Sequence, residues 1–474
     1  MAPKVRCAQS KEAAAKMEAE LLQQLEEGGT MEGLQAVFSA LAASETFVSH
    51  FYGRMPFVLD CGDLVAHRWT LEDQVLLLRH ESYEVYQKDA LPKKPIQLTG
   101  YSRFTHPAIG QAQAHSFMVD TTEVVDTTEA SVRQGLEMGT WVISSGNSLS
   151  PQLAQICLAL QSSFQVPFVT TNVYISRLDS PITAPLHTDR FDSFIMQTEG
   201  AKRWRIFGPG AATPRWPVLD AGMSDRGKAG DVLYLEQVGP LLLDECLKSG
   251  EVVYLPRGFP HATSTFQTSS VSGKTGYSTS LTVSLLLESV GLTVDKVLRC
   301  AAGIHEGRNA LGQCFGAEEI LVATPQHESL RATLPIGFLA PLVAPELRRS
   351  AKTHEEQEEI WVEGMVKEMN RLARSCQLAR WLAERDMLEK VLRRVLSYLW
   401  HALPQATEWC RERVYSTGAV LKQIEPDQRH EVPKHRGSRG CSSWDGSFSH
   451  GCLDRFRRWK KRPWWSSPSF PRRA

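Results

Sequence analysis

Hydrophobic and polar positions recur with different spacings along the chain, and these spacings divide it into regions. Near the N-terminus, Lys11–Glu27 has the spacing of an amphipathic helix, which Gly28 and Gly29 end. A second helix is predicted to run to about Ala42. Residues 1–45 are therefore predicted to be N-terminal helices.

The central part of the chain changes to short apolar runs separated by glycine and proline. A helix is predicted over Pro151–Phe164 and an earlier one over residues 64–90. The runs that we predict as strands are Phe168–Ile175, Phe191–Gln197, Arg203–Phe207, Asp231–Leu235, Glu251–Leu255 and Ser278–Glu288. Many short strands with such turns are typical of a β-sandwich or barrel. Residues 46–290 are therefore predicted to be one β-rich domain.

The C-terminal part returns to helical spacing. Glu355–Arg374 and Leu378–Leu403 have helical periodicity, so residues 291–403 are predicted to be a helical region. A small mixed unit over residues 404–432 follows. Residues 433–474 are rich in Ser, Gly, Pro and Arg, a composition that predicts a disordered tail.

Charge is unevenly distributed, although the formal net charge of the 474 residues is zero. From Pro433 onward there are 11 Lys and Arg against 2 Asp and Glu, whereas the preceding 432 residues carry 42 basic and 51 acidic groups. A mildly acidic body does not indicate sequence-specific DNA binding. The basic run Arg455–Arg462 is compatible with a nuclear or nucleolar signal, a nonspecific polyanion contact, or a non-native extension.

Cysteine usage and hydropathy bear on the compartment. The ten cysteines include no CxxC pair, and the N-terminal residues Met1–Glu20 lack the apolar run of a secretory signal. Reduced thiols in an intracellular protein, in the nucleus or nucleolus or the cytoplasm, are therefore expected. A membrane span is not predicted, because no stretch approaches about 18 consecutive apolar residues.

The segment from Pro185 to Asp189 carries the candidate chemistry. Side chains at positions i and i+2 of a strand point to the same face, so His187 and Asp189 are predicted to converge on one metal ion. His261 follows an apolar strand and a proline-rich turn and is the candidate third ligand. Two histidines and one carboxylate on one face leave coordination positions open, which suits non-haem Fe(II) better than a closed structural zinc site.

The residues around these ligands resemble the JmjC-domain oxygenases, and within them the ribosomal oxygenase subgroup. The run His187–Phe207 fits the pattern H-x-D followed by D-x-F-x-x-Q-x-x-G-x-K-x-W. Further segments agree with the subgroup, at Phe47–Pro56, Gly139–Ile143, Asn172–Ile175 and Leu255–His261, with a fainter match at Arg331–Leu339. The resemblance spans roughly residues 45–290.

This resemblance implies the fold, the cofactors and several site roles. The fold is α+β, with a cupin-like double-stranded β-helix (jelly roll) as its core. Fe(II), bound by His187, Asp189 and His261, would use O2 and the co-substrate 2-oxoglutarate. Lys202 would pair with the distal carboxylate of 2-oxoglutarate, which Asn172, Tyr174 and Ser278 would also contact. Those four assignments complete the predicted site.

The substrate stays open at the level of sequence. The resemblance favours hydroxylation of a His or Arg side chain in a ribosomal protein. Demethylation of an N-methyl-lysine of a histone is the alternative, and a non-catalytic cupin scaffold that binds a partner is a third. The last predicted strand reads Ser280-Leu281-Thr282 where the subgroup often has His-Leu-Thr, and the loop over residues 262–277 is long, so exact transfer of a substrate is in doubt.

The helical region raises a separate question about assembly. By resemblance, residues 291–403 are expected to support a homodimer, and residues 404–432 a remnant of a winged-helix-like module. The alternative is that these helices pack on the β domain as part of one core.

Overall fold

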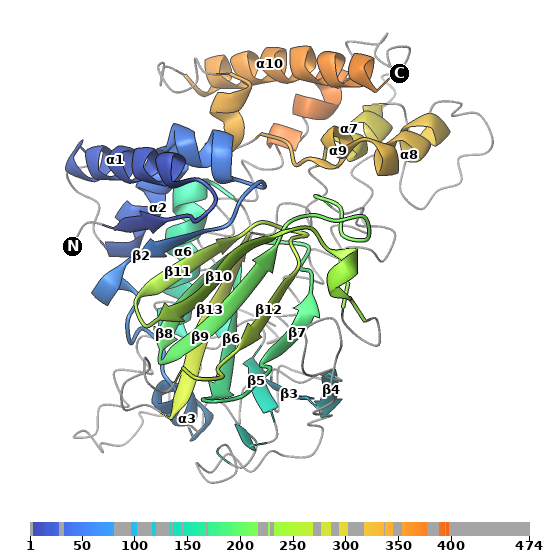
Figure 1. Cartoon of the computed structure of the whole chain (residues 1–474). Helices are drawn as coiled ribbons and strands as arrows, with labels where there is room; N and C mark the ends of the chain where they lie inside the picture. The colour runs from blue at the N-terminus through green and yellow to red at the C-terminus, as the bar shows by residue number, and fades with distance from the viewer. Residues whose placement is uncertain are drawn as a thin grey trace, which may run out of the picture.

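Two β-sheets face each other beneath a layer of helices (Figure 1). The structure is a computed structural model that describes residues 3–27, 33–79, 96–101, 116–119, 133, 136–137, 139–143, 146–148, 150–166, 169–216, 226–227, 232–268, 276–285, 293–301, 317–335, 337–344, 353–376, 388–393 and 395–397. The predicted units at residues 404–432 and 433–474 lie outside these described residues.

The larger sheet has nine strands and the smaller has four, all paired antiparallel. In spatial order the larger contains β1 (Lys4–Arg6), β2 (Phe57–Asp60), β11 (Glu251–Leu255), β8 (Asp192–Glu199), β13 (Tyr277–Leu285), β6 (Val169–Arg177), β5 (Gly139–Ile143), β3 (Ile96–Tyr101) and β4 (Ser116–Val119). The smaller contains β10 (Leu241–Lys248), β9 (Ala201–Phe207), β12 (His261–Ser264) and β7 (Ala184–His187). Strands that alternate between two facing sheets in this way form a jelly roll, so the predicted fold class is confirmed.

The two faces of strand β13 differ in chemistry. Leu281 and Val283 are buried in the hydrophobic cluster that the helices share. Ser280 points the other way, toward the smaller sheet, because the Nζ of Lys202 on β9 donates to its Oγ over 3.3 Å. A strand alternates its side chains between faces, so the space between the sheets is lined by the hydroxyl residues of β13.

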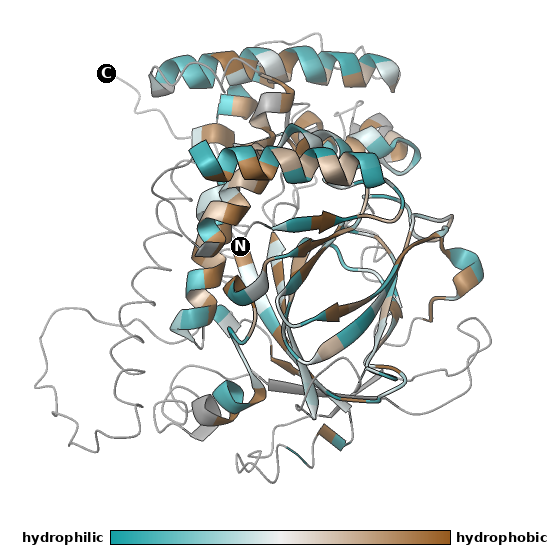
Figure 2. Ribbon diagram, turned by 60° about the vertical axis from the view of Figure 1, so that its left-hand side comes forward, coloured by the Kyte–Doolittle hydropathy of each residue, from teal (hydrophilic) through white to brown (hydrophobic). Residues whose placement is uncertain are grey.

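The helices lie beside the larger sheet, at its lower end and, for the C-terminal ones, in a layer above both sheets (Figure 1). They are α1 (Lys11–Glu27), α2 (Gly33–Ala43), α3 (Leu71–Arg79), α6 (Pro151–Phe164), α7 (Val294–Ala301), α8 (Ala317–Gln326), α9 (Glu328–Arg331) and α10 (His354–Ser375). Shorter turns are the π-helix Phe47–Phe51 and the 3-10 segments Gly62–Leu64, Gly146–Ser148, Leu235–Gln237 and Gly337–Leu342. Figure 2 shows polar and hydrophobic stretches alternating along α1 and α10, as amphipathic helices require.

A single hydrophobic cluster joins these helices to the sheet. It includes Met17 of α1, Leu160 of α6, Leu281 of β13, Leu330 of α9 and Met365 of α10, all buried. The helices that follow the β-sheets therefore pack into the same hydrophobic cluster as the outer face of the larger sheet. This packing matches the alternative in which they belong to the same core, and it leaves the predicted homodimer as a proposal.

Two predicted elements are wrong in their placement. The strand predicted over Asp231–Leu235 is absent from described residues 232–235, and the strand of this insertion is β10, which pairs with β9. The helix predicted to begin near residue 64 begins at Leu71, because His67 has a left-handed backbone (φ 59°) that no helix accommodates. Thr70 and Asp73 then cap the helix start through reciprocal hydrogen bonds.

Candidate metal centre and anion position

His187 is the last residue of β7, and His261 is the first of the neighbouring strand β12. The two residues are paired across the sheet, and their ring centroids lie 4.1 Å apart. The Nδ1 of His187 lies 2.7 Å from the carbonyl of Pro185, and that of His261 lies 3.0 Å from the carbonyl of Phe259. A carbonyl only accepts, so each Nδ1 carries its proton and each Nε2 presents a lone pair.

Asp189 reaches the same point from outside the strand. The sequence predicts that strand alternation brings Asp189 to the same face as His187. Strand β7 ends at His187, however, so alternation does not position Asp189. Instead a loop turns back, and the carbonyl of Asp189 accepts a 2.7 Å hydrogen bond from the backbone N–H of Gly258. The Oδ2 of Asp189 lies 3.5 Å from the Nε2 of His261.

Among the described residues, these three form a candidate metal site, here called the metal cluster. One ligand atom from each of His187, Asp189 and His261 lies within 4.8 Å of the others. Two neutral imidazoles and one carboxylate on one side of a metal ion are the donor set of non-haem Fe(II) oxygenases, which keep the remaining positions for substrates. The donor set of this chain thus fits the metal that its sequence predicts.

Lys202 lies on β9, two strands after β7, and defines the anion position. A tight turn at Gly200 precedes it, with φ of +64°, where an added Cβ would lie 2.2 Å from the carbonyl oxygen of Tyr277. The Lys202 side chain is 2% exposed, and burial lowers the pKa of its ammonium to about 7. No carboxylate among the described residues counters that burial. A buried cation without an acidic partner is suited to an anionic ligand.

Register places the anion position on the strand next to the metal cluster. Ile206 of β9 pairs with His261, and Lys202 precedes Ile206 by four residues on the same face, about 13 Å along the strand. Trp204 lies between them, with its ring stacked 5.8 Å from that of His261. The metal cluster and Lys202 thus stand on one inner face of the smaller sheet, about four residues apart along β9.

The other predicted co-substrate contacts lie on the facing sheet. Asn172 and Tyr174 share a face of β6, where they are half-buried opposite Thr282 and Ser280 of β13. Ser278 is fully buried, and its hydroxyl accepts a 2.9 Å hydrogen bond from Nε2 of Gln197. Their roles toward a co-substrate stay predictions.

Ser280 is a residue that the sequence reasoning did not place in the site. Its hydroxyl is the side-chain partner of the Lys202 ammonium. The available signal was its position in the Ser280-Leu281-Thr282 run, which was treated only as a departure from the family pattern. Strand alternation from Ser278 would have given Ser280 the same face.

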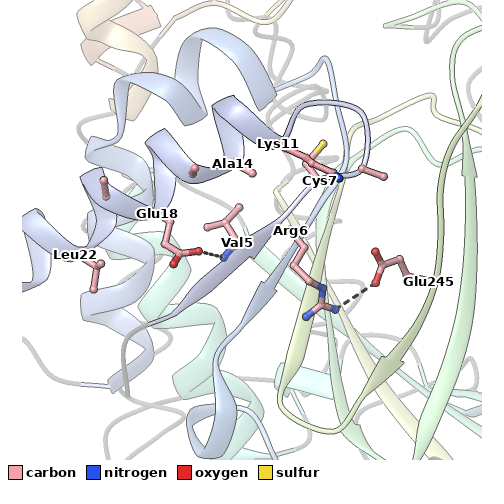
Figure 3. A pocket seen from close by; sticks show the side chains of 11 residues that line it. Val5, Arg6, Cys7, Lys11, Ala14, Glu18, Leu22 and Glu245 are labelled. Atoms are coloured by element: carbon pink, nitrogen blue, oxygen red, sulfur yellow. Dashed lines mark hydrogen bonds and ion pairs between the residues drawn. The ribbon is translucent and has the colours of Figure 1, made fainter.

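A separate cavity of about 580 Å³ lies between β1, at the edge of the larger sheet, and α1, whereas the strands of the metal cluster belong to the smaller sheet. Figure 3 shows Val5, Arg6 and Glu18 at its wall, with the Val5 N–H donating to Glu18 and Arg6 paired with Glu245. These pairs tie the edge strand to its helix and to β10.

Among the helices that the structure describes, none has the length and apolar character of a membrane span.

Comparison with known proteins agrees with this geometry. Residues 144–284 match the family model of the JmjC domain. The chain is 34% identical over 119 residues to the "bifunctional lysine-specific demethylase and histidyl-hydroxylase NO66" of Drosophila persimilis, which is 25% of this chain and 15% of that protein. The Drosophila melanogaster protein of the same name is 34% identical over 110 residues, 23% of this chain and 15% of its own. The matched region therefore covers only about a seventh of these curated relatives.

Among solved structures, the ribosomal oxygenase YcfD from Escherichia coli, in complex with cobalt and 2-oxoglutarate, is 13% identical over 68% of this chain and 70% of its own. The TM-score of 0.31 is too low for the superposition to carry an argument. The assignment depends on the sequence match and on the metal cluster.

Proposed function

We propose, from the match of residues 144–284 to the JmjC domain model, that the protein is an Fe(II)- and 2-oxoglutarate-dependent oxygenase acting on a protein side chain. One observation carries the proposal: ligand atoms of His187, Asp189 and His261 converge. Each histidine Nδ1–H donates to a backbone carbonyl, so that each Nε2 presents its lone pair to a metal. That is the arrangement a 2-His-1-carboxylate iron site needs.

The residues of this chain have distinct tasks in such a reaction. The metal cluster would hold Fe(II), which together with 2-oxoglutarate and O2 supplies oxidation of a C–H bond with formation of succinate and CO2. Lys202 would hold the distal carboxylate of the keto acid, with Ser280 orienting its ammonium. Asn172, Tyr174 and Ser278 would contact the same co-substrate from the facing sheet.

Burial makes Lys202 selective for an anion. Because its pKa is lowered to about 7, the free site carries a weakened charge near neutral pH, and an incoming carboxylate favours the protonated form. The bound acid therefore gains a charged partner in a site that excludes water.

We propose hydroxylation of a ribosomal-protein His or Arg as the reaction, with demethylation of an N-methyl-lysine as the second candidate. The names of the curated relatives contain both activities, and the sequence resemblance to the ribosomal oxygenase subgroup favours the first. The two reactions use one iron site and differ in the carbon presented to it. A non-catalytic scaffold would have no need of the buried Lys202.

The test is turnover with mass spectrometry of defined substrates. The full chain with Fe(II) and 2-oxoglutarate would be incubated with ribosomal proteins and, separately, with methyl-lysine histone peptides. A gain of one oxygen atom supports hydroxylation, and loss of a methylene unit supports demethylation. His187→Ala is the control for metal-dependent turnover. Absence of succinate formation in the wild type under all conditions would overturn the oxygenase proposal in favour of a scaffold.

Assembly and location also belong to the proposal. A homodimer through residues 291–403 is proposed from the family resemblance, and light scattering of the full chain at several concentrations tests it. Location in the nucleus, nucleolus or cytoplasm is proposed from the expected reduced thiols and the basic run Arg455–Arg462. A tagged chain with and without residues 433–474 would assign any targeting to the basic tail.

A further inference from the structure

The turn Pro256–Pro260, between β11 and β12, contacts both sides of the metal cluster. Its Gly258 N–H donates to the backbone carbonyl of Asp189 over 2.7 Å. Its Phe259 carbonyl accepts the Nδ1–H of His261 at 3.0 Å. The position of this turn therefore determines how Asp189 and His261 face each other.

Arg257 fastens the same turn to two buried groups. Its backbone N–H lies 3.4 Å from Oδ1 of Asp192, a 1% exposed carboxylate that also accepts a 2.7 Å hydrogen bond from the Tyr254 hydroxyl. Its own side chain is 1% exposed, and its Nη2 donates to the backbone carbonyl of Arg331 over 2.6 Å. The turn is thus held from the sheet side by Asp192 and from the helix side by Arg331.

Arg331, the last residue of α9, is anchored in turn by several backbone carbonyls. Its Nη1 donates to Thr324 at 3.0 Å and to Pro325 at 2.8 Å, at the end of α8. Its Nε donates to Trp216 at 2.6 Å, in the loop after β9. Arg331 is 7% exposed and its guanidinium is planar, so it holds these segments in one arrangement.

We propose that Arg257 and Arg331 are positioning residues for the metal cluster, so that the helical region beyond the barrel is a working part of the metal site. This inference rests on the proposed function, because it assumes that His187, Asp189 and His261 hold a metal. The contacts run from the Arg331 carbonyl to the Arg257 side chain, and then through the turn Pro256–Pro260 to Asp189 and His261. Neither arginine touches the metal or the reacting atoms.

The test measures metal affinity separately from folding. Co(II) binding would be followed by its visible absorption in the wild type, in Arg257→Met and in Arg257→Lys. Outer partners of metal ligands typically change affinity by 10- to 100-fold, so we expect the Co(II) Kd of Arg257→Met to rise about 10-fold or more, with an altered Co(II) spectrum. Arg257→Lys keeps one donor for the Arg331 carbonyl and is expected to recover part of the affinity.

A matched control and a second variant keep the result decisive. Arg371→Met removes an exposed guanidinium of α10 and should leave Co(II) binding unchanged. If Arg257→Met does not fold, Arg331→Lys, which keeps the charge but not the set of carbonyl contacts, is expected to weaken Co(II) binding in the same direction.

The outcomes separate this inference from the proposed function. Co(II) affinity and spectrum equal to wild type in folded Arg257→Met or Arg331→Lys would overturn the positioning role alone. Wild-type protein that binds no Co(II) would overturn the proposed function and this inference together. A fall in Tm with unchanged Co(II) affinity would show a purely structural role and so also overturn the inference.

Discussion

The metal cluster and the anion position are built in different ways. His187, Asp189 and His261 come from a strand end, a loop and a strand start, and main-chain carbonyls fix both imidazoles. Lys202 lies inside strand β9, opposite Leu247 of β10, so the alternation of a regular strand gives its side chain its direction. The metal cluster therefore depends on loops and on distant anchors, whereas the anion position depends on burial and strand pairing.

The largest expected effect comes from removing a metal ligand. His187→Ala or Asp189→Ala should weaken metal binding at least about 100-fold, beyond the range for outer partners, and stop succinate formation. Isothermal titration with Mn(II) measures the first and a succinate assay the second. Retained activity in both variants would place the metal elsewhere.

Lys202→Ala tests the other half of the comparison. Loss of a charged partner should weaken 2-oxoglutarate binding about 10- to 100-fold, as expected for a hydrogen bond to a charged group, while Mn(II) binding stays near wild type. Titration of each ligand separates the two. Lys248→Ala, at an exposed lysine of β10, is the control. An unchanged 2-oxoglutarate affinity would remove Lys202 from the anion position.

Proton uptake by Lys202 on binding of 2-oxoglutarate tests whether burial sets the charge of the anion position. The pKa of Lys202 is about 7 in the folded chain and 10.5 ordinarily, so at pH 8 the free site holds mostly neutral amine. Binding of 2-oxoglutarate at pH 8 should then take up close to one proton, which calorimetry in buffers of different ionisation enthalpy would detect. Lys202→Arg should bind without uptake, because guanidinium stays charged. Equal uptake in both proteins would contradict the assignment.

The same pKa predicts a dependence of stability on pH. The unfolded chain binds the Lys202 proton between about pH 7 and 10.5 and the folded chain does not, so this group makes stability rise with pH across that window. Lys202→Met should be more stable than wild type at pH 7, and the gap should narrow toward pH 10. Thermal unfolding at several pH values measures this gap. A gap that is constant with pH would mean that Lys202 is not held neutral by burial.

The smallest expected effect distinguishes two serines of one strand. Ser280→Ala removes the 3.3 Å partner of the Lys202 ammonium and should lower 2-oxoglutarate affinity about 2- to 10-fold. Ser278→Ala removes a partner of Gln197 and should mainly lower Tm. Titration with 2-oxoglutarate and thermal unfolding of both variants measure the two effects. The reverse pattern would restore Ser278 as the co-substrate contact.

The sequence by itself determined the chemistry and most of the elements. Spacing and residue type identified His187, Asp189 and His261, and the family resemblance added Lys202. Short apolar runs separated by glycine and proline predicted the β-rich core. These signals are local, since strand alternation and the donor set of a metal are written in short segments.

Only the tertiary structure decided how these groups meet. The route of Asp189 to the histidines depends on a loop held by Gly258, and the role of Ser280 depends on a lysine from the opposite sheet. The pattern of β10 does not predict a strand, because two adjacent charges, Asp244 and Glu245, interrupt its alternation; they pair with Arg203 and Arg6. The contact between Arg257 and Arg331 joins segments far apart in sequence and leaves no periodic signal in either. The acceptor is a backbone carbonyl, which every residue carries, so the sequence does not mark the partner.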